Sequence, residues 1–176
     1  MQEPDDHELM ARLRDGDQEA LRGLIERYQS ALVNYFGRLG AQQDGDDLAQ
    51  ETFVRLYQYR NRYEPRAKFT TFLFTLARHA WADRGRKSAR LERVRRRLME
   101  QPDRMATGPT GDGLDVRAAL AQLPEKLRMV LVLNYYEGMG YEEIGRVLKV
   151  PVGTVKSRVF LAMLRLREMF HEDHTE

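Results

Sequence analysis

Residues 141–160, YEEIGRVLKVPVGTVKSRVF, carry the pattern that most constrains how this chain can fold. Their apolar residues recur at helical intervals on either side of a break at residues 149–152, which predicts two short helices that share one core. Gly145 is small enough for the helices to approach closely, and Pro151 cannot continue the first helix. The segment is therefore predicted to form a helix-turn-helix.

The second helix of this motif is predicted to open at Gly153 and to expose polar side chains. Its outer face carries Thr154, Lys156, Ser157 and Arg158, which can donate hydrogen bonds to phosphates and base edges. This arrangement predicts a helix that enters a DNA groove. An ordinary helical hairpin with a solvated basic face is the alternative that the motif alone leaves open.

The composition is that of a soluble helical protein. Of the 176 residues, 32% are charged and 42% are hydrophobic. The absence of cysteine excludes disulfides, thiolate nucleophiles and cysteine-ligated metals. No apolar stretch approaches the length of a membrane span, and the acidic N-terminus lacks the residue order of a signal peptide. We therefore expect a cytoplasmic protein without membrane insertion.

The net charge of +2 conceals a strong segregation of charge along the chain. Residues 1–59 hold 6 basic and 12 acidic side chains, residues 60–104 hold 14 and 5, and residues 105–176 hold 9 and 10. A basic central block is typical of a surface that binds a polyanion. An acidic first block would repel DNA and suits a basic protein surface instead.

Helical periodicity runs through the chain, and no segment alternates as a strand would. The predicted helices cover residues 6–14, 17–39, 44–59, 70–100, 114–123 and 125–136, followed by the helix-turn-helix. Asp17 is a candidate N-cap, and Pro124 suits a first helical turn. Residues 101–113 change to the proline-rich and glycine-rich composition of a linker. The predicted fold class is all-α, with two helical domains joined by a flexible linker.

Three stretches follow one another in a characteristic order: DDLAQETFVRLYQ, a basic aromatic helix and, after the linker, LPEKLRMVLVLNYYEGMGYEEIGRVLKVPVGTVKSR. In this order they resemble a sigma factor of the extracytoplasmic-function (ECF) group of the sigma-70 family. The resemblance implies a sigma-2 domain at residues 1–98, a linker at 99–114, a sigma-4 domain at 115–170 and a tail at 171–176. It implies a non-enzymatic protein that binds core RNA polymerase and promoter DNA, without a cofactor or a small-molecule substrate. An anti-sigma factor is a further expected partner.

The stretch DDLAQETFVRLYQ can supply apolar residues to a core while its acidic residues stay exposed. The resemblance implies that this helix grips the clamp helices of the largest polymerase subunit. The implied contact residues are Asp47, Gln50, Glu51 and Phe53. Helix capping is favoured over a metal site built from Asp44, Asp46, Asp47 and Glu51, because no glycine-spaced calcium loop is present.

The segment RYEPRAKFTTFLFTLARHAWADRGRK mixes cations with aromatic rings, as promoter melting requires for the DNA backbone and for unstacked bases. The same rings can fill a core, and at least half of them are expected to do so. The resemblance implies capture of a flipped base of the minus 10 element. The implied contact residues are Tyr63, Arg66, Lys68, Phe69, Phe72, His79, Asp83, Arg86 and Lys87. Phe72 and His79 stand where the family commonly has Trp and Asn, which leaves the base preference open.

For the minus 35 element, the resemblance implies contacts from Thr154, Lys156, Ser157, Arg158 and Phe160. Leu161 and Met163 stand where the family often has basic residues, so part of the phosphate contact is missing or moved to Arg165 and Arg167. Lys149 stands where glycine is usual in the turn. A left-handed conformation there would cost on the order of 1 kcal/mol.

Two other functions remain as alternatives to a sigma factor. A stand-alone transcriptional regulator could use the same helix-turn-helix, and it would bind duplex DNA without polymerase. A helical metal-dependent hydrolase could use Asp44, Asp47, Glu51 and His79, although the sequence offers no complete ligand set or nucleophile.

Overall fold

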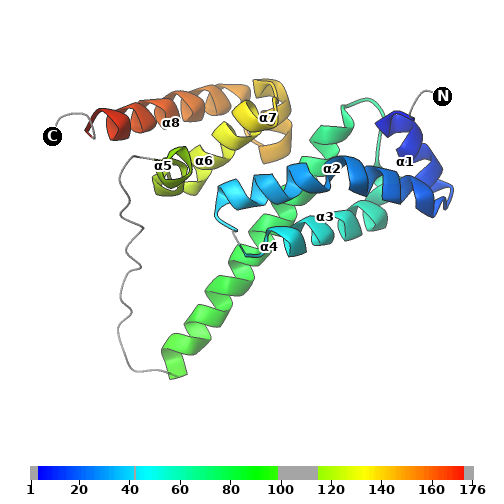
Figure 1. Ribbon diagram of the computed structural model, residues 1–176, viewed down its shortest axis with the longest axis horizontal. Helices are drawn as coiled ribbons and strands as arrows, with labels where there is room; N and C mark the ends of the chain where they lie inside the picture. The colour runs from blue at the N-terminus through cyan, green and yellow to red at the C-terminus, as the bar shows by residue number, and fades with distance from the viewer. Residues whose placement is uncertain (1–3, 42, 99–114, 173–176) are drawn as a thin grey trace.

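The computed structural model describes residues 4–41, 43–98 and 115–172, and within these ranges the regular elements are all helical (Figure 1). In the N-terminal domain they are α1 (Asp6–Arg14), α2 (Gln18–Leu39), α3 (Gly45–Tyr59), the 3-10 turn η1 (Arg60–Arg62) and α4 (Phe69–Leu98). In the C-terminal domain they are α5 (Val116–Gln122), α6 (Glu125–Leu131), the π-helical turn η2 (Val132–Tyr136), α7 (Tyr141–Leu148) and α8 (Val152–Glu172). The predicted all-α class is confirmed.

The ends of α2 follow from its terminal residues. Asp17 is the N-cap, as predicted, and its carboxylate accepts a hydrogen bond from the Glu19 backbone N–H at 2.9 Å. At the other end Gly40 takes a left-handed conformation with φ 114°, which a residue without Cβ adopts at little cost. The turn that follows directs the chain back toward α3, which packs against α2.

The core of the N-terminal domain is built around aromatic rings from α2 and α4. Tyr35 meets Phe36 and Phe74 in edge-to-face geometry, with ring centroids 5.2 and 5.1 Å apart. All three rings are almost fully buried, and burial of a side chain of this size contributes about 1.5–3 kcal/mol. Leu56 from α3 and Leu73 from α4 complete the centre of this core.

Helix α4 divides into two halves of different character. Its first half buries Leu73, Phe74 and Ala77 in the N-terminal domain. Its second half leaves the body of the molecule as an isolated rod (Figure 1), on which Leu91 is 71% exposed. The helix begins at Phe69, one residue before the predicted range, and the structure describes it as far as Leu98.

The C-terminal domain packs α6 and α7 against α8. The single helix predicted for residues 125–136 changes to a π-helical turn at Val132. The chain then closes a tight loop, in which the Asn134 side-chain amide donates to the Met139 carbonyl at 2.8 Å. Ile144 and Val155 pack in the shared core of the helix-turn-helix, as their helical spacing predicted.

The turn between α7 and α8 is tight. Lys149 is left-handed with φ 54°, a conformation that costs a residue with a Cβ on the order of 1 kcal/mol. The Val150 N–H donates to the Gly145 carbonyl at 3.0 Å. A Cβ on Gly145 would lie 2.9 Å from the Val150 carbonyl oxygen, so the turn requires glycine there.

The two domains lie against each other, an arrangement that the sequence did not specify. Helix α4 packs on α7, and α2 contacts α5, α6 and η2. The Arg128 guanidinium of α6 donates to the carbonyl of Leu39 at 2.7 Å, which holds the last turn of α2. The same side chain donates to the Ala121 and Leu123 carbonyls at 2.7 and 2.8 Å. The predicted linker, residues 99–114, lies outside the described residues.

Substitution of Gly145 by alanine tests the close approach of α7 to the turn. We expect Gly145→Ala to lower the free energy of unfolding by about 1–3 kcal/mol, because the added methyl group overlaps backbone. The control is Gly153→Ala, whose Cβ would meet open space in the first turn of α8. Urea denaturation followed by circular dichroism measures both variants. Equal unfolding midpoints for the two would contradict this packing.

Candidate nucleic-acid and protein interfaces

Helix α3 presents an acidic, exposed face beside an open groove. Asp47, Gln50 and Glu51 are exposed, and Glu51 accepts a hydrogen bond from Arg55 at 2.9 Å. The groove between α2 and α3 has a volume of about 980 Å³ and is partly apolar. Val54, which lines it, is 51% exposed.

Phe53 differs from the other three residues predicted to contact polymerase. Its side chain is only 6% exposed and belongs to the core, so only a small part of it lines the groove. Its apolar character and spacing on α3 fit a core residue, and only the family resemblance implied a polymerase contact for it. We therefore treat Phe53 as a packing residue that supports the groove.

Two of the aromatic residues expected to hold DNA bases are buried. Tyr63 and Phe69 are 4% and 2% exposed, and the Tyr63 hydroxyl hydrogen-bonds with the His7 ring. Phe72 is half-buried, and its ring centroid lies 5.3 Å from that of Tyr63. Burial of these apolar rings stabilises the N-terminal domain, and that stabilisation would be lost if the rings turned outward to bind DNA bases. The predicted DNA contacts of Tyr63 and Phe69 do not fit this arrangement.

The cations predicted to contact DNA near the start of α4 and along it are mostly exposed. Arg66, Lys68, Arg86 and Lys87 all reach solvent. Lys68 also forms an ion pair of 3.0 Å with Glu143 of α7, across the domain boundary. Exposed cations such as these suit contact with a phosphate backbone.

Asp83 lies at the centre of a small charge network. It accepts a hydrogen bond from Arg55 at 2.7 Å and another from Arg86. These two hydrogen bonds hold the pKa of the Asp83 carboxyl below its ordinary value. Asp83 is therefore ionised at neutral pH and orients Arg86 at the point where α4 leaves the body.

His79 is half-buried and faces the seam between the domains. Burial, followed by the charges of Arg78, Lys149 and Arg55, holds the pKa of His79 below its ordinary value. Its Nε2 lies 2.9 Å from the Arg78 guanidinium. A neutral ring at this position suits a polar contact with a base better than a phosphate contact.

The residues of the hydrolase alternative do not assemble into a metal site. Asp44 accepts two hydrogen bonds from Arg84, at 2.9 and 2.7 Å, and Glu51 pairs with Arg55. His79 contacts Arg78 instead of a carboxylate. Within the part of the chain that the structure describes, no three His, Asp or Glu residues group as metal ligands would.

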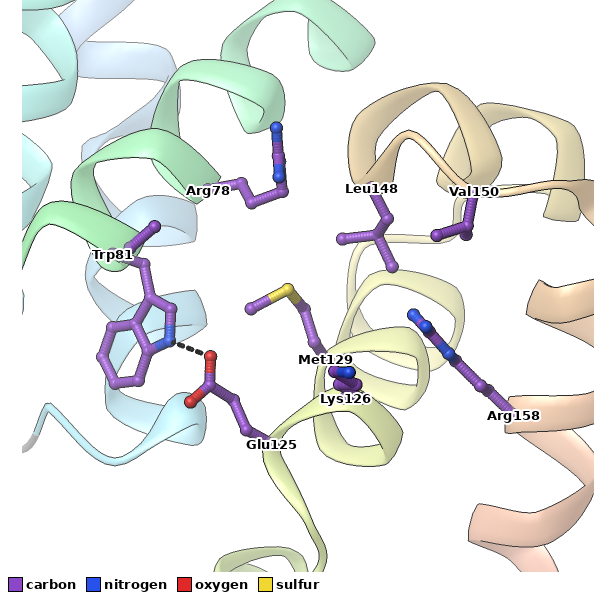
Figure 2. A pocket seen from close by; sticks show the side chains of 9 residues that line it. Arg78, Trp81, Glu125, Lys126, Met129, Leu148, Val150 and Arg158 are labelled. Carbon is purple, nitrogen blue, oxygen red and sulfur yellow. Dashed lines mark hydrogen bonds between the residues drawn. The ribbon is translucent and has the colours of Figure 1, made fainter. Parts of the chain in front are cut away.

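Helix α8 presents a mixed polar and apolar face. Lys156, Ser157 and Phe160 are exposed, whereas Thr154 and Arg158 are half-buried. The Ser157 hydroxyl donates to the Gly153 carbonyl at 3.0 Å, so it is already engaged within the helix. The Arg158 side chain extends toward the seam between the domains (Figure 2).

The comparisons with known proteins divide the chain at the same place as the fold. The family model described as Sigma-70 region 2 matches residues 24–91, and that described as Sigma-70, region 4 matches residues 113–166. Curated relatives of the whole chain are ECF RNA polymerase sigma factors. The chain belongs to the ECF group of sigma-70 factors.

Two curated relatives give the extent of this similarity. The sigma factor is 33% identical over 174 residues to the ECF RNA polymerase sigma factor SigE of Mycolicibacterium smegmatis, covering 92% of the chain and 66% of SigE. It is 29% identical over 171 residues to the ECF RNA polymerase sigma-E factor of Escherichia coli strain K12, covering 89% of the chain and 90% of the relative. The chain thus spans about two thirds of the first relative and most of the second.

Solved structures show the same fold. CnrH in complex with the cytosolic domain of CnrY has a TM-score of 0.72 at 28% identity, over 96% of this chain and 98% of that one. The sigma factor RpoE of Bartonella quintana, in complex with the anti-sigma factor NepR, has a TM-score of 0.71 at 24% identity, over 85% and 96%. The family consists of transcription initiation factors rather than enzymes. The predicted sigma-factor function is confirmed at this level.

The contacts across the domain seam of this sigma factor are functional candidates that sequence reasoning missed. The Trp81 indole N–H donates to Glu125 at 3.0 Å, and the Arg38 guanidinium lies 3.9 Å from the centre of the Tyr136 ring. The partners in each contact are far apart in the sequence, and no local spacing of residues predicts that they meet.

Glu137 is a half-buried titratable group at the same seam. Burial raises the pKa of Glu137 to about 7, and the charge of Arg38 only partly opposes this. An acid whose pKa is raised on folding binds more protons in the folded state than in the unfolded state near pH 6. Its contribution to stability is therefore present at low pH and is lost as the pH rises through about 7.

Removal of this carboxylate should change how stability depends on pH. We expect Glu137→Gln to gain stability relative to the wild-type protein as the pH rises from 5.5 to about 8. The urea unfolding midpoints of both proteins at each pH measure this. The lowered pKa of His79 changes stability with pH in the opposite direction, but His79 is present in both proteins and its effect cancels in the difference. The control is Glu142→Gln, because Glu142 is exposed. The same pH profile for wild type and Glu137→Gln would show that Glu137 is solvated.

Proposed function

We propose that this ECF sigma factor binds core RNA polymerase through its N-terminal domain and contacts promoter DNA with both domains. The sigma-2 domain would be residues 1–98 and the sigma-4 domain residues 115–170, with a linker at 99–114 and a tail at 171–176. The observation that carries the proposal is the charge of neighbouring exposed surfaces. The exposed carboxylates of α3, Asp47 and Glu51, lie beside Arg84 and Lys87 of α4, and the basic half of α4 continues beyond them as a rod.

The polymerase contact is proposed on the exposed part of α3. Asp47, Gln50 and Glu51 are available to a basic partner surface, and the adjoining groove offers apolar area at Val54 and Tyr57. Gln50 lines this groove, whereas Asp47 and Glu51 lie on the side of α3 that faces α4. Exposed charges next to an apolar groove suit a specific protein interface, where buried apolar contacts supply affinity and charges supply orientation. Phe53 supports this surface from the core.

The minus 10 contact is proposed along α4 and the loop before it. The residues retained for it are Arg66, Lys68, Phe72, His79, Asp83, Arg86 and Lys87, without the buried Tyr63 and Phe69. The cations suit the phosphate backbone. Phe72, which is half-buried, is the retained ring for an unstacked base.

The minus 35 contact is proposed on the first two turns of α8. Lys156 and Arg158 would contact base edges in the major groove, and Thr154 near the helix start would contact a phosphate. Ser157 and Phe160 complete the proposed face, with Phe160 68% exposed. Leu161 and Met163 are also exposed, so cations are replaced there by apolar surface.

The proposal includes an anti-sigma factor as a partner and the cytoplasm as the location. The first is supported by the structural similarity to CnrH, which was solved with the cytosolic domain of CnrY. Among the described helices none is long and apolar enough to cross a membrane. We further propose that the chain acts by binding and has no catalytic activity of its own.

The polymerase surface can be tested with the double variant Asp47→Ala, Gln50→Ala. We expect its dissociation constant for core polymerase to rise roughly tenfold or more, because two exposed interface residues are truncated. Fluorescence anisotropy of the labelled sigma factor titrated with core polymerase measures this. Glu26→Ala, an exposed carboxylate on α2 outside the groove, is the control. An equal or smaller effect for the double variant than for the control would refute this surface.

The recognition helix can be tested with Lys156→Ala and Arg158→Ala. We expect each to weaken holoenzyme binding at the minus 35 element roughly 5- to 100-fold, with core polymerase binding unchanged. Arg117→Ala, an exposed arginine on α5, is the control for general loss of charge. Footprinting of holoenzyme on a target promoter measures the effect. Normal protection of the minus 35 element with both variants means that α8 is not the reading helix.

A further inference from the structure

A small cavity opens at the seam between the two domains. Its volume is about 280 Å³, near the lower end of the range for small-molecule sites. Trp81 and Arg78 of α4 lie on one side, and residues of α6, α7 and α8 lie on the other (Figure 2). Met129, Leu148 and Val150 give the cavity an apolar lining from the C-terminal domain.

Three cations from three helices reach this cavity: Arg78 of α4, Lys126 of α6 and Arg158 of α8 (Figure 2). The one carboxylate in its lining, Glu125, already accepts the Trp81 indole N–H at 3.0 Å. Among the described residues, none of the three cations forms an ion pair with a carboxylate. The cavity therefore carries an excess of positive charge that the protein itself does not balance.

Arg78 is the most confined of the three cations. Its Nε is buried without a hydrogen-bond partner, and its guanidinium otherwise contacts the ring of His79 at 2.9 Å. His79 is held in its neutral form by burial and by the positive charges around it, which lower its pKa. A partly buried guanidinium loses hydration, and a neutral ring beside it compensates for little of that loss. An anion bound to the guanidinium would supply the missing charged hydrogen bonds.

We propose that this cavity binds a small phosphorylated ligand, a phosphate monoester with a compact apolar group, held between Arg78, Lys126 and Arg158. A phosphate monoester carries close to two negative charges at neutral pH, with oxygens for several donors at once. Arginine and lysine together form the usual donor set for such a group. The apolar group would lie against Met129, Leu148 and Val150.

The site needs both domains. Arg78 belongs to the N-terminal domain, and the other two cations belong to the C-terminal domain. A ligand that contacts all three must stabilise the packed arrangement of the domains, since it binds that arrangement better than a separated one. If the proposed role of Arg158 at the minus 35 element also holds, ligand and promoter compete for this side chain.

Isothermal titration calorimetry of the full chain, at low salt and without polymerase or DNA, tests the site directly. The probes are phenyl phosphate, inorganic phosphate and phenol. We expect saturable binding of phenyl phosphate with one site per chain, weaker binding of inorganic phosphate and none of phenol. Absence of saturable phenyl phosphate binding up to millimolar concentration overturns the proposal, and it leaves the sigma-factor function untouched because neither polymerase nor promoter is present.

Variants from each domain separate this site from general attraction to a basic protein. Arg78→Gln and Lys126→Gln should each weaken phenyl phosphate binding about tenfold. Arg117→Gln, which removes an exposed charge away from the cavity, should leave it unchanged. Circular dichroism confirms that each variant is folded before titration. Unchanged affinity in Arg78→Gln, or an equal loss in Arg117→Gln, overturns a site that bridges the domains.

Discussion

Burial of the first half of α4 is the constraint on which both domains depend. Leu73, Phe74 and Ala77 join this half to the core of the N-terminal domain, and α7 packs against the same helix from the other domain. The helix is 30 residues long, so the fixed first half also fixes where the second half points. The basic rod projects because its base is held in an apolar core.

Much of this arrangement could be predicted from the sequence, because it depends on local chemistry. Asp17 was predicted as a candidate N-cap of α2, and the structure confirms it. The conformation of Lys149 in the turn was left open, and the structure shows it to be left-handed. A capping residue can be predicted because it serves the backbone donors of its nearest neighbours in the sequence. The all-α class followed in the same way from periodicity.

The sequence left open which aromatic residues lie in the core, although at least half of those in residues 62–87 were expected there. Tyr63 and Phe69 stand among polar or charged residues, and such a pattern suits either a base-binding surface or a core. Packing of α1, α2 and α4 around them decides in favour of the core. The domain seam was equally beyond prediction, since Lys68 and its partner Glu143 are joined only by the folded chain.

The central claim is that this chain gives core RNA polymerase its promoter specificity. The most direct measurement is in vitro transcription of fragmented genomic DNA from the source organism by core polymerase, with and without the purified chain, followed by mapping of transcript 5′ ends. The account predicts a defined set of start sites that appear only with the chain and share minus 10 and minus 35 elements. No chain-dependent start sites, with DNA bound equally well in the absence of polymerase, would contradict it and identify a stand-alone DNA-binding protein instead.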